Sequence, residues 1–433
     1  MMQKLFYVLV FLILNSCMEK FEVPEDIINQ GSSGLSAGDT TFVQIKPSWG
    51  SNYGFVNPSE ISIAQDGRVY IVDSSASSIH VLNQDGDKPL GFEGLLNLAD
   101  DSGIQINPTD VDIDKKMNVF FIDGSEKIFV WNQYWNDTGI KKVSTSGVFT
   151  HLETQVDTLV YYGSDLWFSI LNNDEWAAKE INSEVDQSMI DSLINPHTFY
   201  DGGNETNQFL DTYYNSELST FSGLTTTYDS ENHIFVADDY GGINNQYRIM
   251  EITFQRSLLI ELNNDELVWA FRGRYGSTLK GYGTGAGTVN RPVSLDMDYQ
   301  GNIYYTQVGD FFPIHMLIPN LSGDFATYPS GFQPNVDDIM NAQAYNYLVD
   351  VSLDKNKNIY VVDKGGEVVT VFNSDGEYFK KAGLVGDSLS ILNNPVAVAI
   401  DERGVVYVCN DGDSSIYRFK LSNSLDEDLK PED

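Results

Sequence analysis

The chain has 433 residues, of which 42% are hydrophobic, and 62 acidic side chains outnumber 26 basic ones to give a formal net charge of −36. A polyanion of this kind lacks the positive surface that holds a phosphate backbone, so nucleic acid is excluded as a partner. The hydrophobic fraction is too high for a disordered acidic chain. Two cysteines cannot form a disulfide scaffold.

The N-terminus predicts export. Lys4 precedes an apolar run over residues 5–14, which as a helix would cover about 15 Å, half of a bilayer core. The run therefore predicts a signal peptide and not a membrane span. It ends in Leu14-Asn15-Ser16-Cys17, which resembles the lipobox of bacterial lipoproteins. The resemblance implies removal of residues 1–16 and lipidation of Cys17, for example with palmitate; an ordinary signal peptide is the alternative.

Residues 17–38 are rich in Gly and Ser toward their end and predict a flexible tether. We therefore expect an outer-membrane protein held by its lipid alone, at the cell surface or on the periplasmic face. Glu19 matches the surface-export signals of some lipoproteins only in part, so both faces stay open. Residues 422–433 form an acidic tail.

One sequence unit recurs along residues 39–421. Its clearest copy is NPVAVAIDERGVVYVCNDGDSSIYRFKL from Asn394. Other copies begin at Asn57, Asn107, Gly223, Asn290 and Tyr347, and the weakest begins at Thr154. Each copy has short apolar runs separated by tight turns rich in Asp, Asn and Gly, a pattern typical of antiparallel strands.

Four short strands per unit predict an all-β fold, a single β-propeller of four-stranded antiparallel blades. We count seven blades, with six as the alternative because the copy at Thr154 is weak. The last unit stops after its third strand, so residues 40–46 are expected to supply its outer strand and close the ring.

The recurring NP-x-x-(apolar)-x-(apolar)-D-x-x-G-x-(apolar)-Tyr-(apolar)-x-D pattern resembles NHL-repeat β-propellers. The resemblance implies a central channel and one binding face, and it does not imply a single activity.

Residues 172–222 exceed what a blade needs and predict a helical insertion. Residues 183–186 resemble a helix start, and the apolar face expected for the helix comprises Val185, Met189, Ile190, Leu193 and Ile194.

Carboxylates recur where the second strand of each unit ends. One interpretation is a ring of acids that suits calcium; the other is that each Asp caps a local turn, which its recurrence favours. The acids concerned are Asp73, Asp123, Asp238, Asp239, Asp310, Asp363, Asp411 and Asp413. The pairs Asp112/Asp114 and Asp296/Asp298 permit shared metal binding, again in competition with turn capping. Asp238, Asp239 and His315 form a weak candidate metal site. No cofactor is firmly indicated.

Aromatic side chains are the stronger lead for ligand binding, because exposed rings stack on sugars or peptide side chains. Trp176, Tyr240, Phe311 and Phe312 fall in loops of the expected binding face, and Arg272 and Arg274 are conspicuous in an acidic chain. No catalytic motif is present.

The sequence thus favours a binding module for an extracytoplasmic glycan, peptide or envelope protein, either a monomer or a subunit of an outer-membrane complex. The alternative is a metal-dependent hydrolase or lyase acting on an extracellular carbohydrate or lactone. Whether any reaction is catalysed stays open.

Overall fold

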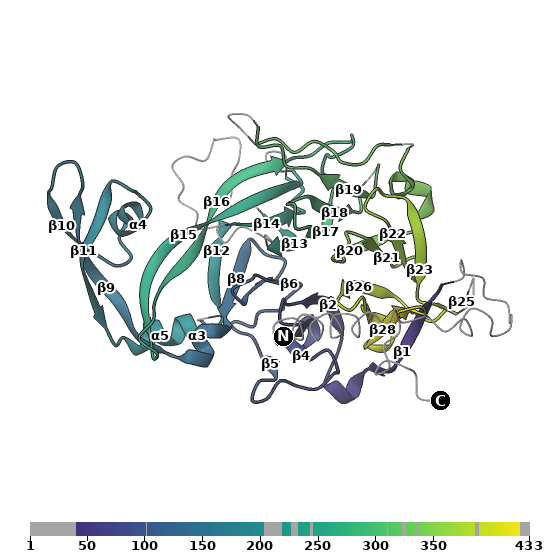
Figure 1. Ribbon diagram of the computed structural model, residues 1–433, viewed down its shortest axis with the longest axis horizontal. Coiled ribbons are helices and arrows are strands. Elements are labelled where there is room, and N and C mark those ends of the chain that lie inside the picture. Colours follow the sequence, from purple (N-terminus) through teal and green to yellow (C-terminus); the bar gives the residue numbers. More distant parts are fainter. Residues whose placement is uncertain are drawn as a thin grey trace, which may run out of the picture. The chain divides into compact units, whose positions relative to one another are not determined.

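Antiparallel sheets arranged around a central channel make up most of the computed structural model (Figure 1). The structure describes residues 40–100, 102–202, 219–226, 233–242, 246–309, 311–322, 326–334, 336–385 and 389–424. Residues 42–433 form one structural unit. Cys17, the predicted signal peptide and tether, and residues 425–433 of the predicted acidic tail lie outside the described residues.

Five sheets have the size of a propeller blade, with three or four strands each. Their strands are β2 (Pro58–Ile63), β3 (Val69–Asp73), β4 (Ser78–Leu82) and β5 (Gly94–Leu95); β6 (Asp110–Ile113), β7 (Asn118–Ile122), β8 (Lys127–Asn132) and β12 (His197–Asp201); β17 (Pro292–Met297), β18 (Ile303–Gln307) and β19 (Ile314–Leu317); β20 (Leu348–Leu353), β21 (Ile359–Asp363), β22 (Val368–Phe372) and β23 (Tyr378–Ala382); and β26 (Pro395–Ile400), β27 (Val406–Asn410), β28 (Ser415–Leu421) and β1 (Phe42–Trp49).

A larger, seven-stranded sheet takes a further place in the ring. Its strands are β9 (Ile140–His151), β10 (Asp157–Tyr161), β11 (Trp176–Glu184), β13 (Phe221–Thr226), β14 (His233–Asp238), β15 (Arg248–Leu262) and β16 (Leu267–Lys280). A separate two-stranded sheet joins β24 (Leu384–Val385) to β25 (Leu389–Ser390).

The innermost strands close the ring: β2 contacts β6, followed by β13, β17, β20 and β26, which returns to β2. Each sheet is covered on both faces by its neighbours, so the middle strands are apolar throughout instead of alternating. In β3, for example, Val69, Tyr70, Ile71 and Val72 are all fully buried. The core is accordingly a series of apolar clusters, one between each pair of neighbouring sheets.

The expected ring closure is confirmed. Strand β1 pairs antiparallel with β28 and is the outer strand of the last blade, so one blade unites both ends of the propeller. Trp49 in β1 is fully buried, and the Arg418 guanidinium of β28 lies 4.7 Å from the centre of its ring. The strand thus covers an edge that would otherwise expose unpaired backbone groups.

The expected number of blades is wrong. Five blade-sized sheets are present among the described residues, not seven or six, and the remaining place in the ring belongs to the seven-stranded sheet. The repeat copy at Thr154 is not a blade. Its first strand, β10, pairs only with β9, and its second expected strand is instead helix α4 (Asp165–Leu171). Ser164 caps that helix by accepting the N–H of Trp167.

We call β9, β10, α4 and β11 the arm. It is inserted between the third and fourth strands of the second blade, β8 and β12, and β9 pairs with the distal end of β15. One face of its sheet packs against α4 through Phe149, Val160, Trp167, Phe168 and Ile170. The insertion therefore begins well before residue 172, where the sequence placed it.

Two further helices flank the arm, α3 (Gln133–Thr138) and α5 (Gln187–Ile194). The helix expected after residue 186 is confirmed as α5, capped by Asp186. Its buried Ile190 packs with Met189, Leu193 and Ile194 against β9 and β15. Val185 is not part of this face: it precedes the helix and is 71% exposed. Residues 197–201 are blade strand β12 and not insertion.

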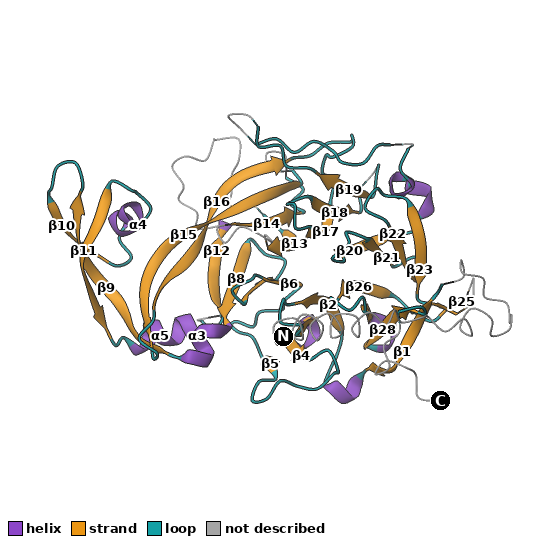
Figure 2. Ribbon diagram, viewed as in Figure 1, coloured by secondary structure: helices purple, strands orange, loops and turns teal. Residues whose placement is uncertain are grey.

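Helices are short and lie between strands (Figure 2). The single-turn helices are η1 (Ser51–Tyr53), η2 (Ser74–Ala76), η4 (Asp338–Met340), η5 (Ala342–Ala344) and η6 (Asp411–Asp413). Within the described ranges, none of the helices combines the length and the hydrophobicity needed to cross a bilayer.

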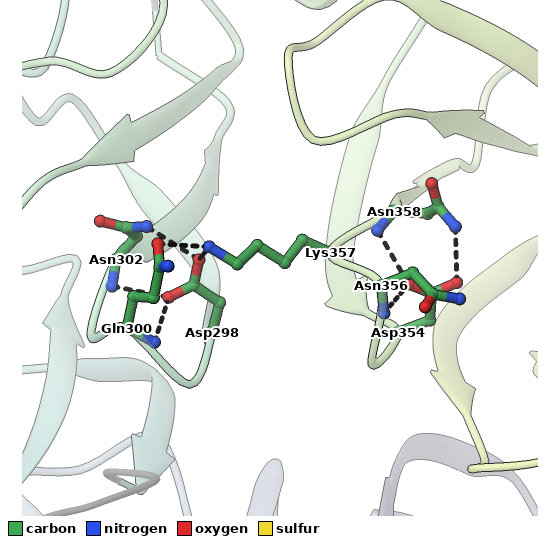
Figure 3. A network of polar contacts seen from close by, with 7 residues as sticks. All are labelled: Asp298, Gln300, Asn302, Asp354, Asn356, Lys357 and Asn358. Atoms are coloured by element: carbon green, nitrogen blue, oxygen red, sulfur yellow. Dashed lines mark hydrogen bonds and ion pairs between the residues drawn. The ribbon is translucent and has the colours of Figure 1, made fainter.

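The turns between the first and second strands of the β17 and β20 blades are each built on one Asp, and a lysine connects the two turns (Figure 3). Asp298 accepts Nδ2 of Asn302 at 2.8 Å, and Asp354 accepts Nδ2 of Asn358 at 2.7 Å in the next blade. Lys357 extends from the second turn to the first, where its Nζ lies 3.1 Å from Oδ2 of Asp298. The capping interpretation is confirmed for Asp298.

Candidate functional site

The central channel is lined by alternate residues of the innermost strands and encloses a cavity of about 270 Å³. Glu60, Asp110 and Asp350 occupy equivalent positions, opposite Val72, Ile122 and Val362, the residues that precede Asp73, Asp123 and Asp363. Asp112 and Asp296 occupy the equivalent position two residues further on. Five carboxylates thus face one narrow space.

Four of these carboxylates are bonded to the backbone of the next innermost strand. Asp110 and Asp112 of β6 accept the N–H groups of Leu224 and Thr226 in β13, at 2.6 and 2.7 Å. The other two bonds, both 2.7 Å, run from Leu353 N–H to Asp296 and from Val398 N–H to Asp350. The channel acids therefore connect neighbouring sheets at the axis of the ring.

Burial raises the pKa of all five channel carboxyls, because the charged form loses its hydration. The pKa of Asp296 rises to about 8 through burial and the nearby charges of Asp112 and Asp350. Burial raises the pKa of Asp350 to about 6. Two carboxyls in one cavity can consequently hold or release protons near neutral pH.

The residues that end the second strands hold the chain entering the same blade. Asp73 accepts the N–H groups of Val56 and Asn57, and Asp363 accepts those of Asn346 and Tyr347. Gln307 and Asn410 make the same kind of bond to Asn290 and Asn393. The capping interpretation of the recurring Asp is confirmed at Asp73 and Asp363. Asp310 lies outside the described residues.

The candidate metal residues have other contacts. Asp238 is fully buried, where it accepts Nε of Arg248 at 2.9 Å and the N–H of Thr220. The pKa of Asp239 is raised by burial. His315 is stacked on Tyr305, and its Nδ1 accepts the Gly287 N–H at 2.9 Å. Burial lowers the pKa of His315 to about 4, so the ring is neutral.

In the part of the chain that the structure describes, no three His, Cys, Asp or Glu side chains are arranged to hold a metal ion. The channel carboxylates do not fit a calcium site as they stand, because four of them are bonded to backbone N–H groups of neighbouring sheets.

Three of the candidate ligand-binding residues lie on strands of the seven-stranded sheet, Trp176 on β11 and Arg272 and Arg274 on β16. Trp176 begins strand β11, is half-buried and contacts the His151 ring edge to face at 4.8 Å. Arg272 of β16 lies over the Phe168 ring of α4, with 3.4 Å from its guanidinium carbon to the ring centre. Arg272 and Arg274 both donate to the side chain of Gln255. The arm thus brings Trp176 and Arg272 to one apolar cluster.

The other three candidates are separated from the arm in sequence. Tyr240 follows β14 and is half-buried. Phe311 is 57% exposed and lines a small cavity with Pro313 and Tyr345, whereas Phe312 is half-buried with its ring against His315.

An aromatic pocket that the sequence did not indicate lies between the second blade and the long β15–β16 hairpin, with a volume of about 460 Å³. Its base is a chain of ring contacts running from Phe120 to Phe199 at 5.1 Å, to Phe254 at 4.9 Å and to Phe271 at 5.9 Å. Further lining rings are Trp135 and Tyr134 of α3 and Trp269 of β16. We call this space the aromatic pocket.

Polar side chains stand among these rings. Asn132 bonds to Asn118 and caps α3 by accepting the Trp135 N–H at 2.8 Å. Glu266 accepts the hydroxyl of Tyr134. The remaining polar lining residues are Lys116, His197 and Arg256. Such a mixture of flat apolar walls and a few directed polar groups is typical of small-molecule sites.

The sequence contained one usable signal for this pocket, the alternation of Trp269 and Phe271 beside the pair Arg272 and Arg274. Their partners Phe120, Trp135 and Phe199 lie at least 70 positions earlier, in the second blade and in α3. The two groups meet because the second blade packs against the β15–β16 hairpin, with Phe120 and Phe199 in one apolar cluster with Phe254 and Phe271.

No protein-family model matches the chain, and no curated protein matches it either. Solved structures that resemble it include a virginiamycin B lyase from Staphylococcus aureus, with 12% identity, covering 88% of this chain and 100% of that chain, and a TM-score of 0.43. A gluconolactonase from Xanthomonas campestris shows 8% identity, and the match covers 89% of this chain and 90% of that chain with a TM-score of 0.45. A calcium-binding regucalcin from Agrobacterium tumefaciens shows 8% identity, and the match covers 87% of this chain and 94% of that chain with a TM-score of 0.42.

The chain is a β-propeller, an assignment that rests on the ring of sheets described above. The resemblance to NHL repeats stays a prediction.

The raised pKa of Asp296 predicts that the free energy of unfolding falls as pH rises from 5 to 8. In this window the folded state keeps a proton that the unfolded chain, with an ordinary Asp, has already released. Asp296→Asn cannot titrate and should flatten this slope by up to about 1.4 kcal/mol per pH unit. Urea denaturation at several pH values measures it.

Asp157→Asn is the matched control. The hydrogen bond from Lys179 lowers the pKa of Asp157, which therefore titrates below this window. A wild-type slope that Asp296→Asn leaves unchanged would contradict the role of Asp296.

Proposed function

We propose that the protein is an extracytoplasmic binding module that holds a saccharide in the aromatic pocket. The observation that supports this most is the pocket itself, of about 460 Å³, in which seven aromatic rings from the second blade, α3 and the β15–β16 hairpin converge. Ligand sites typically have volumes of about 300–1,000 Å³.

The pocket chemistry suits a sugar for two reasons. The half-buried ring of Trp269 and the 40% exposed ring of Tyr134 offer flat apolar faces of the kind that stack on the C–H face of a sugar. Asn118, Asn132 and His197 place donors and acceptors beside these faces.

Trp269→Ala should weaken saccharide binding at least about tenfold, because it removes a wall of the pocket. The measurement is a glycan-array screen of the purified protein, followed by titration calorimetry on the best saccharide. Trp176→Ala is the matched control: it also truncates a half-buried Trp on a strand of the seven-stranded sheet, but it lies outside the pocket lining.

A saccharide lost with Trp176→Ala and kept with Trp269→Ala would contradict the pocket and favour the arm cluster. An array without any saccharide bound would contradict the proposal as a whole and direct the search to a peptide or an envelope protein.

We also propose that the propeller is tethered to the outer membrane through lipid on Cys17, as a monomer or as a subunit of an envelope complex. The support is the residue pattern over 1–17 and the state of the other cysteine. Cys409 is fully buried in β27, where burial raises the pKa of its thiol, so it suits neither lipidation nor redox exchange.

Cys17→Ala should abolish incorporation of labelled palmitate and release the protein from the membrane fraction. Cys409→Ala serves as the control and should keep both. Palmitate that persists in Cys17→Ala would show that the lipid is attached elsewhere, and a wild-type protein without palmitate would show that the signal peptide is an ordinary one.

A second candidate function is a metal-dependent hydrolase or lyase working in the channel on a carbohydrate or lactone. The observation that favours it is the pair Asp296 and Asp350, whose raised pKa values suit proton donation and acceptance near neutral pH within one cavity. Calcium would belong to this function, although the described carboxylates form no ready metal group.

Elemental analysis and lactone hydrolysis before and after chelation test this candidate. Stoichiometric calcium together with chelator-sensitive turnover that Asp296→Asn abolishes would support it. A metal-free protein without turnover would contradict it.

A further inference from the structure

Two cations stand at the aromatic pocket of an otherwise strongly acidic protein. Lys116 and Arg256 are both exposed and both line the pocket, whereas the chain as a whole has a net charge of −36. They come from different sheets, so their proximity to one pocket is a product of the tertiary fold.

Lys116 lies in the turn between β6 and β7. Its Nζ is 6.0 Å from the centre of the Phe271 ring, the outermost ring of the pocket base. Its backbone N–H donates to Asp114, whose carboxylate also accepts from Asn118, so Asp114 caps this turn. The turn thereby sets the position from which the lysine side chain extends over the pocket.

Arg256 lies in β15, directly opposite Phe271 of β16 in the hairpin register. Its guanidinium carbon is 6.0 Å from the centre of the Trp269 ring. The two aromatic residues of β16 that line the pocket are therefore each accompanied by one cation. Each cation thus lies close to one ring of the pocket lining.

Glu266 is the acidic side chain among the residues that line the pocket, and it is bonded to the Tyr134 hydroxyl at the hairpin turn. Among the lining residues alone, two cations stand beside one carboxylate, a positive excess that Asp114, next to the lining, partly offsets at Lys116. A neutral sugar would gain nothing from it, whereas a sugar with a carboxylate or sulfate would gain a charge-assisted contact.

We propose that the aromatic pocket selects saccharides that carry negative charge, with Lys116 and Arg256 as the residues that determine this specificity. The inference rests on the proposed function, since it names the class of saccharide bound at that site. Two exposed charges near an anion contribute about tenfold to a hundredfold in affinity together at low salt, and less as salt screens them.

The experiment compares matched saccharides that differ only in charge. Oligogalacturonate and its fully methyl-esterified form test the carboxylate, and a sulfated galactan oligosaccharide and its desulfated form test the sulfate. Each is titrated into the full chain, into Lys116→Gln/Arg256→Gln and into Lys380→Gln/Lys381→Gln. The last variant loses the same charge on β23, where Lys380 lies 5.8 Å from the Phe379 ring, away from the pocket.

The expected result is a charged member bound at least about tenfold more tightly than its neutral partner. That preference should fall at least about fivefold in Lys116→Gln/Arg256→Gln and stay unchanged in Lys380→Gln/Lys381→Gln. Which pair shows the preference identifies carboxylate or sulfate as the recognised group.

Equal binding of both members in a Trp269-dependent manner would overturn this inference and leave the proposed function standing. A charge preference that both double variants reduce equally would also overturn it, because the net charge alone would then explain the effect. If Trp269→Ala leaves binding of every tested saccharide unchanged, or no saccharide binds, the proposed function fails together with the inference.

Discussion

No sheet of this propeller can exist by itself, because both of its faces are apolar and must be covered by a neighbour. The fully buried run Val69-Tyr70-Ile71-Val72 illustrates this constraint: in a free sheet it would expose one apolar face to water. Closure through β1 is the condition for burying the last of these faces. At the axis of the ring, hydrogen bonds also connect each sheet to the next. The carboxylates that accept them from the next innermost strand are Asp110, Asp112, Asp296 and Asp350.

The arm is inserted at a position where closure of the propeller ring puts no constraint on the chain. Between β8 and β12 the chain is at the outer rim of a blade, so an insertion there adds strands and helices without disturbing the ring. The insertion stabilises itself through two apolar clusters, one inside the arm and one beneath α5. Its anchoring on β15 lengthens the β15–β16 hairpin beyond a blade strand, and that extra length supplies Phe254, Trp269 and Phe271 to the pocket.

Charge is distributed unevenly between the two cavities. The channel gathers five carboxylates in a confined space, which raises their pKa values, whereas the aromatic pocket has Lys116 and Arg256 at its rings. In a chain of net charge −36, a locally positive lining has to be assembled from distant segments. The two cavities therefore suit different chemistry: proton exchange in the channel, and a flat amphipathic ligand in the pocket.

The sequence by itself determined the all-β propeller, the closing strand, the capping role of Asp73 and Asp363, and the helix after residue 186. Each of these features depends on a short-range pattern in the sequence or on burial that the residue types of the segment indicate directly. It failed on the repeat copy at Thr154, where Ser164 starts a helix over Trp167 and Phe168, residues that suit a strand equally well. The number of blades and the aromatic pocket were decided only by tertiary structure. The residue pattern of a strand shows that a segment can pair with another strand. Which strand it pairs with depends on the apolar surfaces that remain exposed once the ring has closed.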